Sequence, residues 1–494
     1  GLLVDSRVGS DASDLAVRYG GKIDDDTYYR IYVKGRADDD LQEAPTPVGE
    51  KSQWQDARTG FRIDHYSSQD DKFTLQGDGF NQSASDQLVN GQALANYTHD
   101  YRSGQNILAR WTHTISDTSD FSLQAYYDRI DFRDGFSSFE GNSFDIDFQH
   151  RFELIKNNQV MYGMGARLLA NDVGSPTLPQ PVVNPTDREM YQLSAFVQDT
   201  ITLRPDLLHL ILGTKLEDAS FAGFQVQPSA RLLWTPNNNT SVWGAISRAV
   251  RTPSRQEWDD SLNLIVPNGP GQLAELHKIS NHPRSEQLLA YEMGLRQQIT
   301  KTLSVDATGF FNNYDGLIST RTTGVTIDPA ATPPTIINQT YTNAQDAQTY
   351  GTEIAVDWQV EDNWKLSWSY SLLLAEVQDT KAGVTPNASA VAQSYPQNQF
   401  QLHSYVDITR HVEFNSSIYY VQDVGSRNVL GAVGAAPGSY WRADFGVAWH
   451  PDANFEFYIG VQNAFDNHHL EAPYNGPSSA EVDRAVYAQL TWKH

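Results

Sequence analysis

Residues with the chemistry to bind a metal or a polar ligand gather in two segments of the chain. The segment 253–285 follows Arg251 directly and carries Trp258, Asp259, Asp260, His277 and His282. A later segment carries the neighbouring imidazoles of His468 and His469. Imidazole nitrogens bind metals, but adjacent residues point apart and two ligands do not complete a site. The alternative is that all four are ordinary solvated loop histidines and that Arg251 pairs with nearby carboxylates.

An acidic run, Asp38, Asp39 and Asp40, opens the segment 38–54. Carboxylate oxygens are the ligands that calcium prefers, so this run suggests a loop-bound calcium ion. It lacks the fixed glycine and the distal glutamate of a defined calcium loop, and a solvated acidic surface is the alternative reading. The sequence suggests no other cofactor.

Several classes of function are disfavoured by what the sequence contains and lacks. The formal net charge of −24 argues against nucleic-acid binding, which needs clustered lysine and arginine. The chain has no cysteine, which excludes disulfides and thiolate metal sites. It also contains no Gly-x-Ser-x-Gly elbow, phosphate-binding loop or His-Glu-x-x-His motif, so we do not expect an enzyme.

The elements that must position these residues are strands with alternating polarity. Every even position from 224 to 232 is apolar and every odd one is polar, and 303–309 alternates with the opposite parity. Because strand side chains point alternately to opposite faces, Asp145 and Asp147 share the polar face of one strand. Glu353 and Asp357 share that of another. A soluble sandwich of two sheets would show the same alternation.

Three features favour a membrane barrel over a sandwich. The strands often exceed the 9–11 residues that cross a bilayer, and no run reaches the roughly 20 apolar residues of a transmembrane helix. Tight turns such as 24–26 alternate with long connections at 38–54, 172–188, 253–285, 322–345, 379–397 and 466–482. Tryptophans recur near strand ends, where aromatic side chains line membrane interfaces, at Trp234, Trp243, Trp358, Trp449 and Trp492.

The predicted fold is therefore all-β: a transmembrane, antiparallel, up-and-down β-barrel of about 22 strands in a Gram-negative outer membrane. Short turns would face the periplasm and long loops the exterior. The pattern fills residues 1–494 and leaves no room for a second domain.

Segments along nearly the whole chain resemble the barrel portion of the TonB-dependent outer-membrane receptors. They occur in the family's order at 195–199 (AFVQD), 210–217 (LILGTKLE), 247–254 (SRAVRTPS), 281–286 (NHPRSE), 291–294 (YEMG), Asn343 with 351–353 (GTE), and 460–466 (GVQNAFD). The segment 247–254 is similar to the family signature S-x-A-x-R-x-P-S, and 460–466 to the closing G-x-x-N-L-F-D.

The resemblance implies energised uptake of a scarce, bulky ligand: most often a ferric siderophore or other metal chelate, otherwise haem, cobalamin or an oligosaccharide. It also implies a plug domain, through which the TonB complex would act. The first residues resemble the family's first barrel strand, so we expect the plug as a separate polypeptide or a segment removed from this chain. Haem receptors of the family place a histidine ligand in the loop that corresponds to 253–285, which implicates His277 or His282.

Two other functions remain open at this point. Without a plug, such a barrel would be a passive channel, and its many carboxylates would make it cation-preferring. Alternatively, the barrel would serve only as an adhesin or a phage-docking scaffold.

Overall fold

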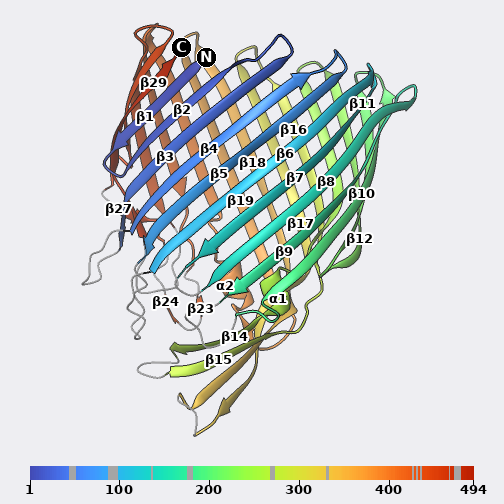
Figure 1. The fold of residues 1–494 in the computed structure, drawn as a ribbon, viewed down its shortest axis with the longest axis vertical. Helices are drawn as coiled ribbons and strands as arrows, with labels where there is room; N and C mark the ends of the chain where they lie inside the picture. Colours follow the sequence, from blue (N-terminus) through green and yellow to red (C-terminus); the bar gives the residue numbers. More distant parts are fainter. Residues whose placement is uncertain are drawn as a thin grey trace.

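The computed structural model describes residues 1–43, 52–86, 98–134, 137–174, 182–267, 273–329, 333–425, 428–429, 432–433, 437–466, 468–471 and 480–494. Its strands form a tilted, closed wall with both chain termini at one end (Figure 1). We call the end that holds the termini the turn end and the opposite end the loop end. No helix within the described ranges is long and apolar enough to cross a membrane.

The wall is an antiparallel barrel of 22 strands, as the sequence predicted. In chain order the wall strands are β1 (Leu2–Gly9), β2 (Ala12–Lys22), β3 (Thr27–Glu43), β4 (Ser52–Tyr66), β5 (Asp71–Asp86), β6 (Thr98–Ser116), β7 (Ser119–Arg133), β8 (Ser138–Ile155), β9 (Asn158–Gly174), β10 (Asp187–Arg204), β11 (Leu208–Ala219), β12 (Gly223–Asn237), β13 (Thr240–Arg251), β16 (Glu286–Gln298), β17 (Leu303–Ile327), β18 (Thr335–Glu361), β19 (Trp364–Asp379), β21 (Asn398–Thr409), β22 (Val412–Val421), β25 (Tyr440–Trp449), β26 (Phe455–Gln462) and β29 (Ala485–Lys493). Each pairs with its neighbour along the wall, and β1 pairs with β29 to close the ring.

The connections carry the remaining described elements. These are α1 (Arg255–Asp259), β14 (Ser261–Pro267), β15 (Leu273–Ser280), β20 (Val384–Thr385), α2 (Ala388–Ala392), β23 (Asn428–Val429), β24 (Ala432–Val433), β27 (His468–Leu470) and β28 (Ala480–Asp483). All of them belong to connections at the loop end. At the turn end, successive strands are joined by only two to five residues.

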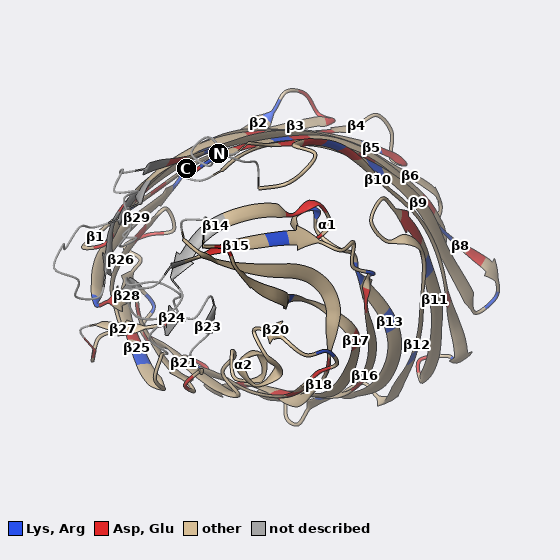
Figure 2. Ribbon diagram, turned by 90° about the horizontal axis from the view of Figure 1, so that it is seen from below, with Lys and Arg blue, Asp and Glu red and all other residues tan. Residues whose placement is uncertain are grey.

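The two faces of the wall differ as the alternation predicts. α1 and α2 lie inside the ring in Figure 2, and inside it Arg255 of α1 hydrogen-bonds to Asn171 of the wall. Asn171 therefore points inward, and the same face of β9 carries Arg167, which binds Asp145 of β8 at 2.9 Å. The opposite face carries apolar side chains such as Phe144 and Leu168, which are 48% and 58% exposed. An interior this polar and an exterior this apolar suit a barrel in a lipid bilayer.

Aromatic side chains form a belt on the outer face near the turn end. Trp449 stacks on Phe457 at 5.4 Å between ring centroids, and Phe455 stacks on Trp492 at 6.1 Å. Trp234 and Trp358 also lie on the outer face and are 46% and 43% exposed. These four tryptophans lie on the outer face near the turn end, and their place at a membrane interface stays a prediction.

Trp243 differs from the predicted interface position. It is paired with Leu233 and Gly294, on the inner face, and the guanidinium carbon of Arg231 lies 5.8 Å from its ring centroid. Trp243 does lie near the end of strand β13. Whether its side chain faces outward or inward depends on strand parity, and the small and apolar residues around it do not distinguish the two faces.

The loop end contains more regular structure than the sequence indicated. The segment 322–345 was expected to be a loop, yet β17 continues to Ile327 and β18 begins at Thr335. Beyond the rim, β18 pairs in parallel with β15, and β17 pairs with β20. The partners that stabilise this extension come from distant connections, so local composition could not predict it.

Candidate ligand-binding site at the loop end

The short helix α1 begins at a complete capping box. The Ser254 side chain accepts a hydrogen bond from the Glu257 amide at 3.2 Å, and the Glu257 carboxylate accepts one from the Ser254 amide at 2.7 Å. A Ser-x-x-Glu spacing satisfies two otherwise free amides reciprocally, which is why a helix starts here. The helix points its charged residues at the inner wall.

Arg251 anchors this helix to the barrel. Its guanidinium donates to both Glu286 oxygens at 2.6 Å and to both Glu257 oxygens at 2.9 and 3.0 Å. Glu286, on β16, is the register partner of Arg251. The Oε1 atom of Glu286 also accepts a hydrogen bond from the Ile318 amide. The structure thus engages Arg251, a predicted ligand residue, in ion pairs with carboxylates.

A buried ion cluster fastens the end of α1 to the neighbouring connection. The Asp259 side chain is 2% exposed and lies 2.7 Å from the Arg188 guanidinium and 3.5 Å from that of Arg255. Arg255, itself 9% exposed, also donates to the backbone carbonyls of Pro185 and Thr186 at 2.6 Å each. Buried charges require such partners, so these contacts fix the position of the whole segment.

A second buried cluster lies at the root of the β14–β15 hairpin. The Lys278 ammonium is 3.6 Å from the Asp260 carboxylate and donates to the Tyr341 hydroxyl at 2.6 Å. Burial raises the pKa of Asp260 to about 6, although Lys278 opposes this. Burial also lowers the pKa of Lys278 and raises that of Tyr341. The hairpin therefore depends on a carboxyl that is costly to keep charged.

We expect the β14–β15 hairpin to open less often at mildly acidic pH. The folded pKa of Asp260, about 6, exceeds its ordinary 3.8, so the stability it contributes is present at low pH and lost as pH rises through 6. One pKa unit corresponds to about 1.4 kcal/mol, so local opening should become about tenfold rarer between pH ~7.5 and ~5. Amide hydrogen exchange of β14 and β15, expressed as protection factors relative to the intrinsic rate at each pH, measures this.

The matched variant for this pH effect is Asp260→Asn, which should remove the dependence while leaving Lys278 and Tyr341 in place. Protection factors that instead fall on acidification would show that the attraction between Lys278 and the ionised carboxylate outweighs its burial.

Three rings from two connections form a stack that includes Trp258 of α1. The Trp258 ring lies 5.1 Å from Phe221 and 4.7 Å from His282, with interplanar angles of 19° and 26°. The structure thus brings together two of the predicted ligand residues, Trp258 and His282. The exposed imidazole ends the stack, at a residue with a φ of 47°.

A polar cavity of about 640 Å³ opens next to His282. It lies where the β17–β18 ribbon twists as it leaves the wall, at a register shift between Tyr314 and Ile318 that contains Gly316 with a φ of 67°. Asn343 fastens the crossing by accepting from the Arg284 amide at 2.9 Å and donating to the Arg284 carbonyl at 2.9 Å. The charged side chains lining the cavity include Arg284, Asp315, Asp346 and Lys381.

The other predicted histidines lie elsewhere. His277, in β15, pairs with Glu275 at 2.8 Å and stands in register with Asn263 and Asn338, so it is not part of the aromatic stack. His468 begins β27 in register with Asp483.

His469 is 8% exposed and lies within hydrogen-bonding distance of Asn463 and Glu471, at 3.2 and 3.1 Å. Asn463, 1% exposed with a φ of 51°, is the centre of this cluster and explains the asparagine of the closing motif. His469 therefore organises the last connection and presents little surface to a ligand.

The calcium hypothesis for Asp38, Asp39 and Asp40 stays a prediction. All three residues lie within strand β3, and Asp38 pairs with Arg36 at 3.0 Å. The side chains of Asp39 and Asp40 fall outside the described part of the structure. Among the described residues, no group of three or more histidine or acidic side chains is arranged to hold a metal ion.

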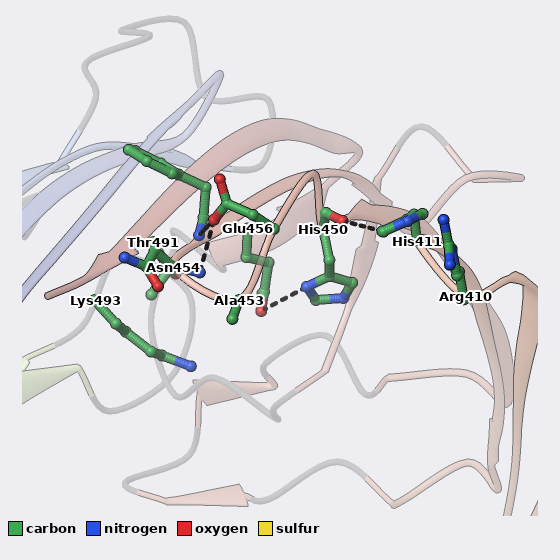
Figure 3. A pocket seen from close by; sticks show the side chains of 10 residues that line it. Arg410, His411, His450, Ala453, Asn454, Glu456, Thr491 and Lys493 are labelled. Atoms are coloured by element: carbon green, nitrogen blue, oxygen red, sulfur yellow. Dashed lines mark hydrogen bonds and ion pairs between the residues drawn. The ribbon is translucent and has the colours of Figure 1, made fainter.

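A smaller cavity, of about 340 Å³, lies at the turn end (Figure 3). His450 lies 3.1 Å from the Glu413 carboxylate, and the His411 ring contacts the His450 carbonyl at 2.8 Å. Its histidines are thus held by neighbouring residues of the turns. We therefore place the candidate ligand site at the loop end.

Sequence reasoning missed the roles of Arg188, Arg255, Lys278 and Tyr341. The capping box at Ser254 and Glu257 was a readable signal for α1. The partners of the buried charges come from β10 and β18, and no spacing within the segment 253–285 reveals them.

A closed wall with an apolar outer band, a polar interior and loops gathered at one end defines a transmembrane β-barrel protein. The model of the family described as TonB dependent receptor-like, β-barrel, matches residues 14–464. This chain therefore belongs to the TonB-dependent receptor barrel family. No curated protein matches its sequence.

Solved receptor and transporter structures share this fold. The siderophore receptor PirA from Acinetobacter baumannii superposes with a TM-score of 0.77 at 15% identity, over 99% of this chain and 80% of that one. A mutant of the ferric enterobactin receptor PfeA from Pseudomonas aeruginosa gives 0.78 at 13% identity, over 99% and 79%. The copper transporter OprC gives 0.74 at 14%, over 99% and 80%. Identities this low establish the fold alone.

Proposed function

We propose that this protein is the barrel of an outer-membrane receptor that takes up a ferric siderophore or another metal chelate through the TonB complex. Family membership over residues 14–464 is the observation that carries this proposal. A plug domain, present in the cell as another segment or polypeptide, would occupy the polar interior and connect the barrel to TonB. The loop end would face the exterior of a Gram-negative cell.

The loop-end geometry supports a receptor more than a passive channel. α1 and α2 lie inside the ring, and the buried clusters around Asp259 and Asp260 hold connections over the mouth (Figure 2). A general diffusion channel gains nothing from fixing connections there, whereas a receptor needs a preorganised surface for its ligand. The cavity beside His282 offers both charge signs and several amide and hydroxyl groups. The comparisons lend no support to the passive, cation-preferring channel.

Uptake by cells tests this proposal. A strain lacking the gene should lose accumulation of one class of chelate, and the full gene product should restore it only while the proton gradient is intact. The probes are ferric enterobactin, a ferric hydroxamate, haem, cobalamin and copper(II). Within the responsive class, His282→Ala should weaken ligand binding by about tenfold, as expected for loss of one well-placed contact.

Two results would count against the receptor. Uptake that survives collapse of the proton gradient, together with a large steady conductance of the full gene product in planar bilayers, would identify a passive channel. Normal uptake of every probe in the deletion strain, with cell or phage binding lost, would favour an adhesin or docking scaffold.

A further inference from the structure

The outer wall over β1–β7 carries a hollow at the height where, over β4–β7, its apolar band ends. This part of the wall faces the viewer in Figure 1. Two adjoining cavities of about 510 and 660 Å³ share Ala57 and Asn81. Their lining comes mainly from side chains of the same parity as the exposed Ile31 and Val33, so the hollow lies outside the barrel.

Strand register divides this surface into rows that run around the wall. The row nearest the turn end is apolar and contains Ile31, Phe61, Ile107, Tyr127 and Phe144, each 36% to 51% exposed. Over β4–β7 the next rows toward the loop end are mostly small or polar: first Thr59, Gly79, Gln105 and Arg129, then Ala57, Asn81, Ser103 and Asp131, then Gln55, Ser83 and Tyr101. Over β1–β3 the same rows contain Gly35 and Ala37 but also the exposed apolar side chains of Val33, Leu15 and Val8.

The hollow exists because small residues in these rows leave its floor open. A Cβ added at Gly79 would approach nothing nearer than the Gly104 carbonyl oxygen at 3.6 Å, and one at Gly35 nothing nearer than the Asp56 carbonyl oxygen at 4.0 Å. Neither glycine is required by a close approach or a positive φ. Their effect is to leave room on the outer surface.

The exposed polar groups that β4–β6 contribute to this floor are neutral hydrogen-bonding groups. Gln55, Asn81 and Gln105 are exposed, and their amides make no hydrogen bond within the described part of the chain. Arg129, the cation at the rim, is already paired with Asp131 at 3.1 Å and with Glu140 at 3.0 Å. Tyr101 adds an exposed ring. Neutral amides, hydroxyls and an aromatic ring recognise sugars better than they recognise a phosphate, which needs free cations.

We propose that this hollow binds a glycolipid of the surrounding leaflet. Its acyl chains would lie along the apolar row, and the hydroxyls and amides of its sugar headgroup would bond to Gln55, Asn81 and Gln105. The site lies on the opposite side of the wall from the lumen and does not involve the ligand cavity beside His282. The inference rests on the proposed outer-membrane location, in which the loop end meets the glycolipid leaflet, but not on TonB or on any transported ligand.

Native mass spectrometry of the full gene product in detergent tests this site. The probes are lipid A, lipid A stripped of its phosphates, phosphatidylethanolamine and phosphatidylglycerol. We expect both forms of lipid A to bind in preference to both phospholipids. The double variant Asn81→Ala and Gln105→Ala should weaken lipid A binding by about tenfold, as expected for two lost hydrogen bonds.

A second variant tests the floor. Gly79→Val should fill the hollow and displace lipid A without disturbing the wall, since the added Cβ makes only ordinary van der Waals contacts at 3.6 and 4.0 Å and β-branched residues suit strands. Its matched control is Gly309→Val on the far outer wall, where the nearest atoms lie at 3.9 Å. The control for the amide pair is Asn313→Ala with Gln348→Ala, two outer-face residues paired near the loop end of that same far wall.

Each other outcome overturns the proposal. Loss of binding on removing the phosphates would mean that the site recognises an anion. Equal binding of phospholipids would mean nonspecific annular lipid, and equal effects of the control variants would mean the same. A dimer that dissociates in Gly79→Val would identify the hollow as an interface between copies of this chain.

Discussion

Asp259→Ala should detach the α1 segment from the inner wall while leaving the barrel intact. The carboxylate is 2% exposed and serves both Arg188 and Arg255, of which Arg255 is 9% exposed. Removing one partner of a buried ion pair costs about 3–5 kcal/mol, because the remaining charge stays buried without compensation. We expect the lower part of this range, since backbone carbonyls also hold Arg255. Hydrogen exchange over 252–285 should rise by about a hundredfold.

The control for this variant is Asp315→Ala. Asp315 forms an ion pair with Arg284 at 2.9 Å, close to the 2.7 Å between Asp259 and Arg188, but the side chains of Asp315 and Arg284 are 52% and 61% exposed. Exposed pairs contribute about 0–1 kcal/mol, so exchange should scarcely change. Ligand binding should weaken in Asp259→Ala if the connection must be preorganised. Unchanged exchange in Asp259→Ala would mean that the carbonyl contacts of Arg255 suffice to hold α1.

Much of the barrel could be predicted because strand alternation is a local property. The alternate positions of Asp145 and Asp147 indicate which face of β8 is the inner one, and tight turns such as 24–26 indicate which strand ends lie at the turn end. Counting between such signals predicted about 22 strands, the number that the structure has. The family motifs occur in the family's order along the chain and so supported the same fold, although they do not show which strands pair with one another.

The candidate site was less predictable because its contacts are not local. Residue type identified Arg251 and His469 as potential ligand groups, but type does not reveal that Glu286 or Asn463 already engages them. Trp258 and His282 lie in one segment, yet the third ring of their stack, Phe221, comes from another connection. The extension of β17 and β18 depends on β15 and β20 in the same way. The alternation of polar and apolar residues is enough to predict the strands of the wall. The structure of the loop end depends on contacts between residues that are far apart in the sequence.

Gly351→Ala should strongly impair assembly of the wall itself. Gly351 is the glycine of the Gly-x-Glu segment, where β18 enters its final part toward the turn end, and Phe310 of β17 is its register partner. A Cβ there would lie 1.9 Å from the Leu372 carbonyl oxygen and 2.8 Å from a ring carbon of Phe310. The ring can rotate, but the carbonyl belongs to the backbone of β19, so the β18–β19 ladder would have to move. Overpacking costs about 1–3 kcal/mol, and a backbone clash belongs at the upper end.

Gly309→Ala provides the comparison, because Gly309 lies beside this position on β17 and its added Cβ would be 3.9 Å from the nearest atoms. Replacing a glycine whose backbone suits alanine stabilises a protein by about 0.4–1 kcal/mol through the unfolded chain. The folded fraction of each variant in membranes can be measured by its heat-modifiable mobility on a gel. We expect it to fall severalfold for Gly351→Ala and to hold or rise for Gly309→Ala. Equal yields of the two would mean that β18 and β19 can separate locally without loss of the ring, and that the glycine is not required by the close approach of Leu372.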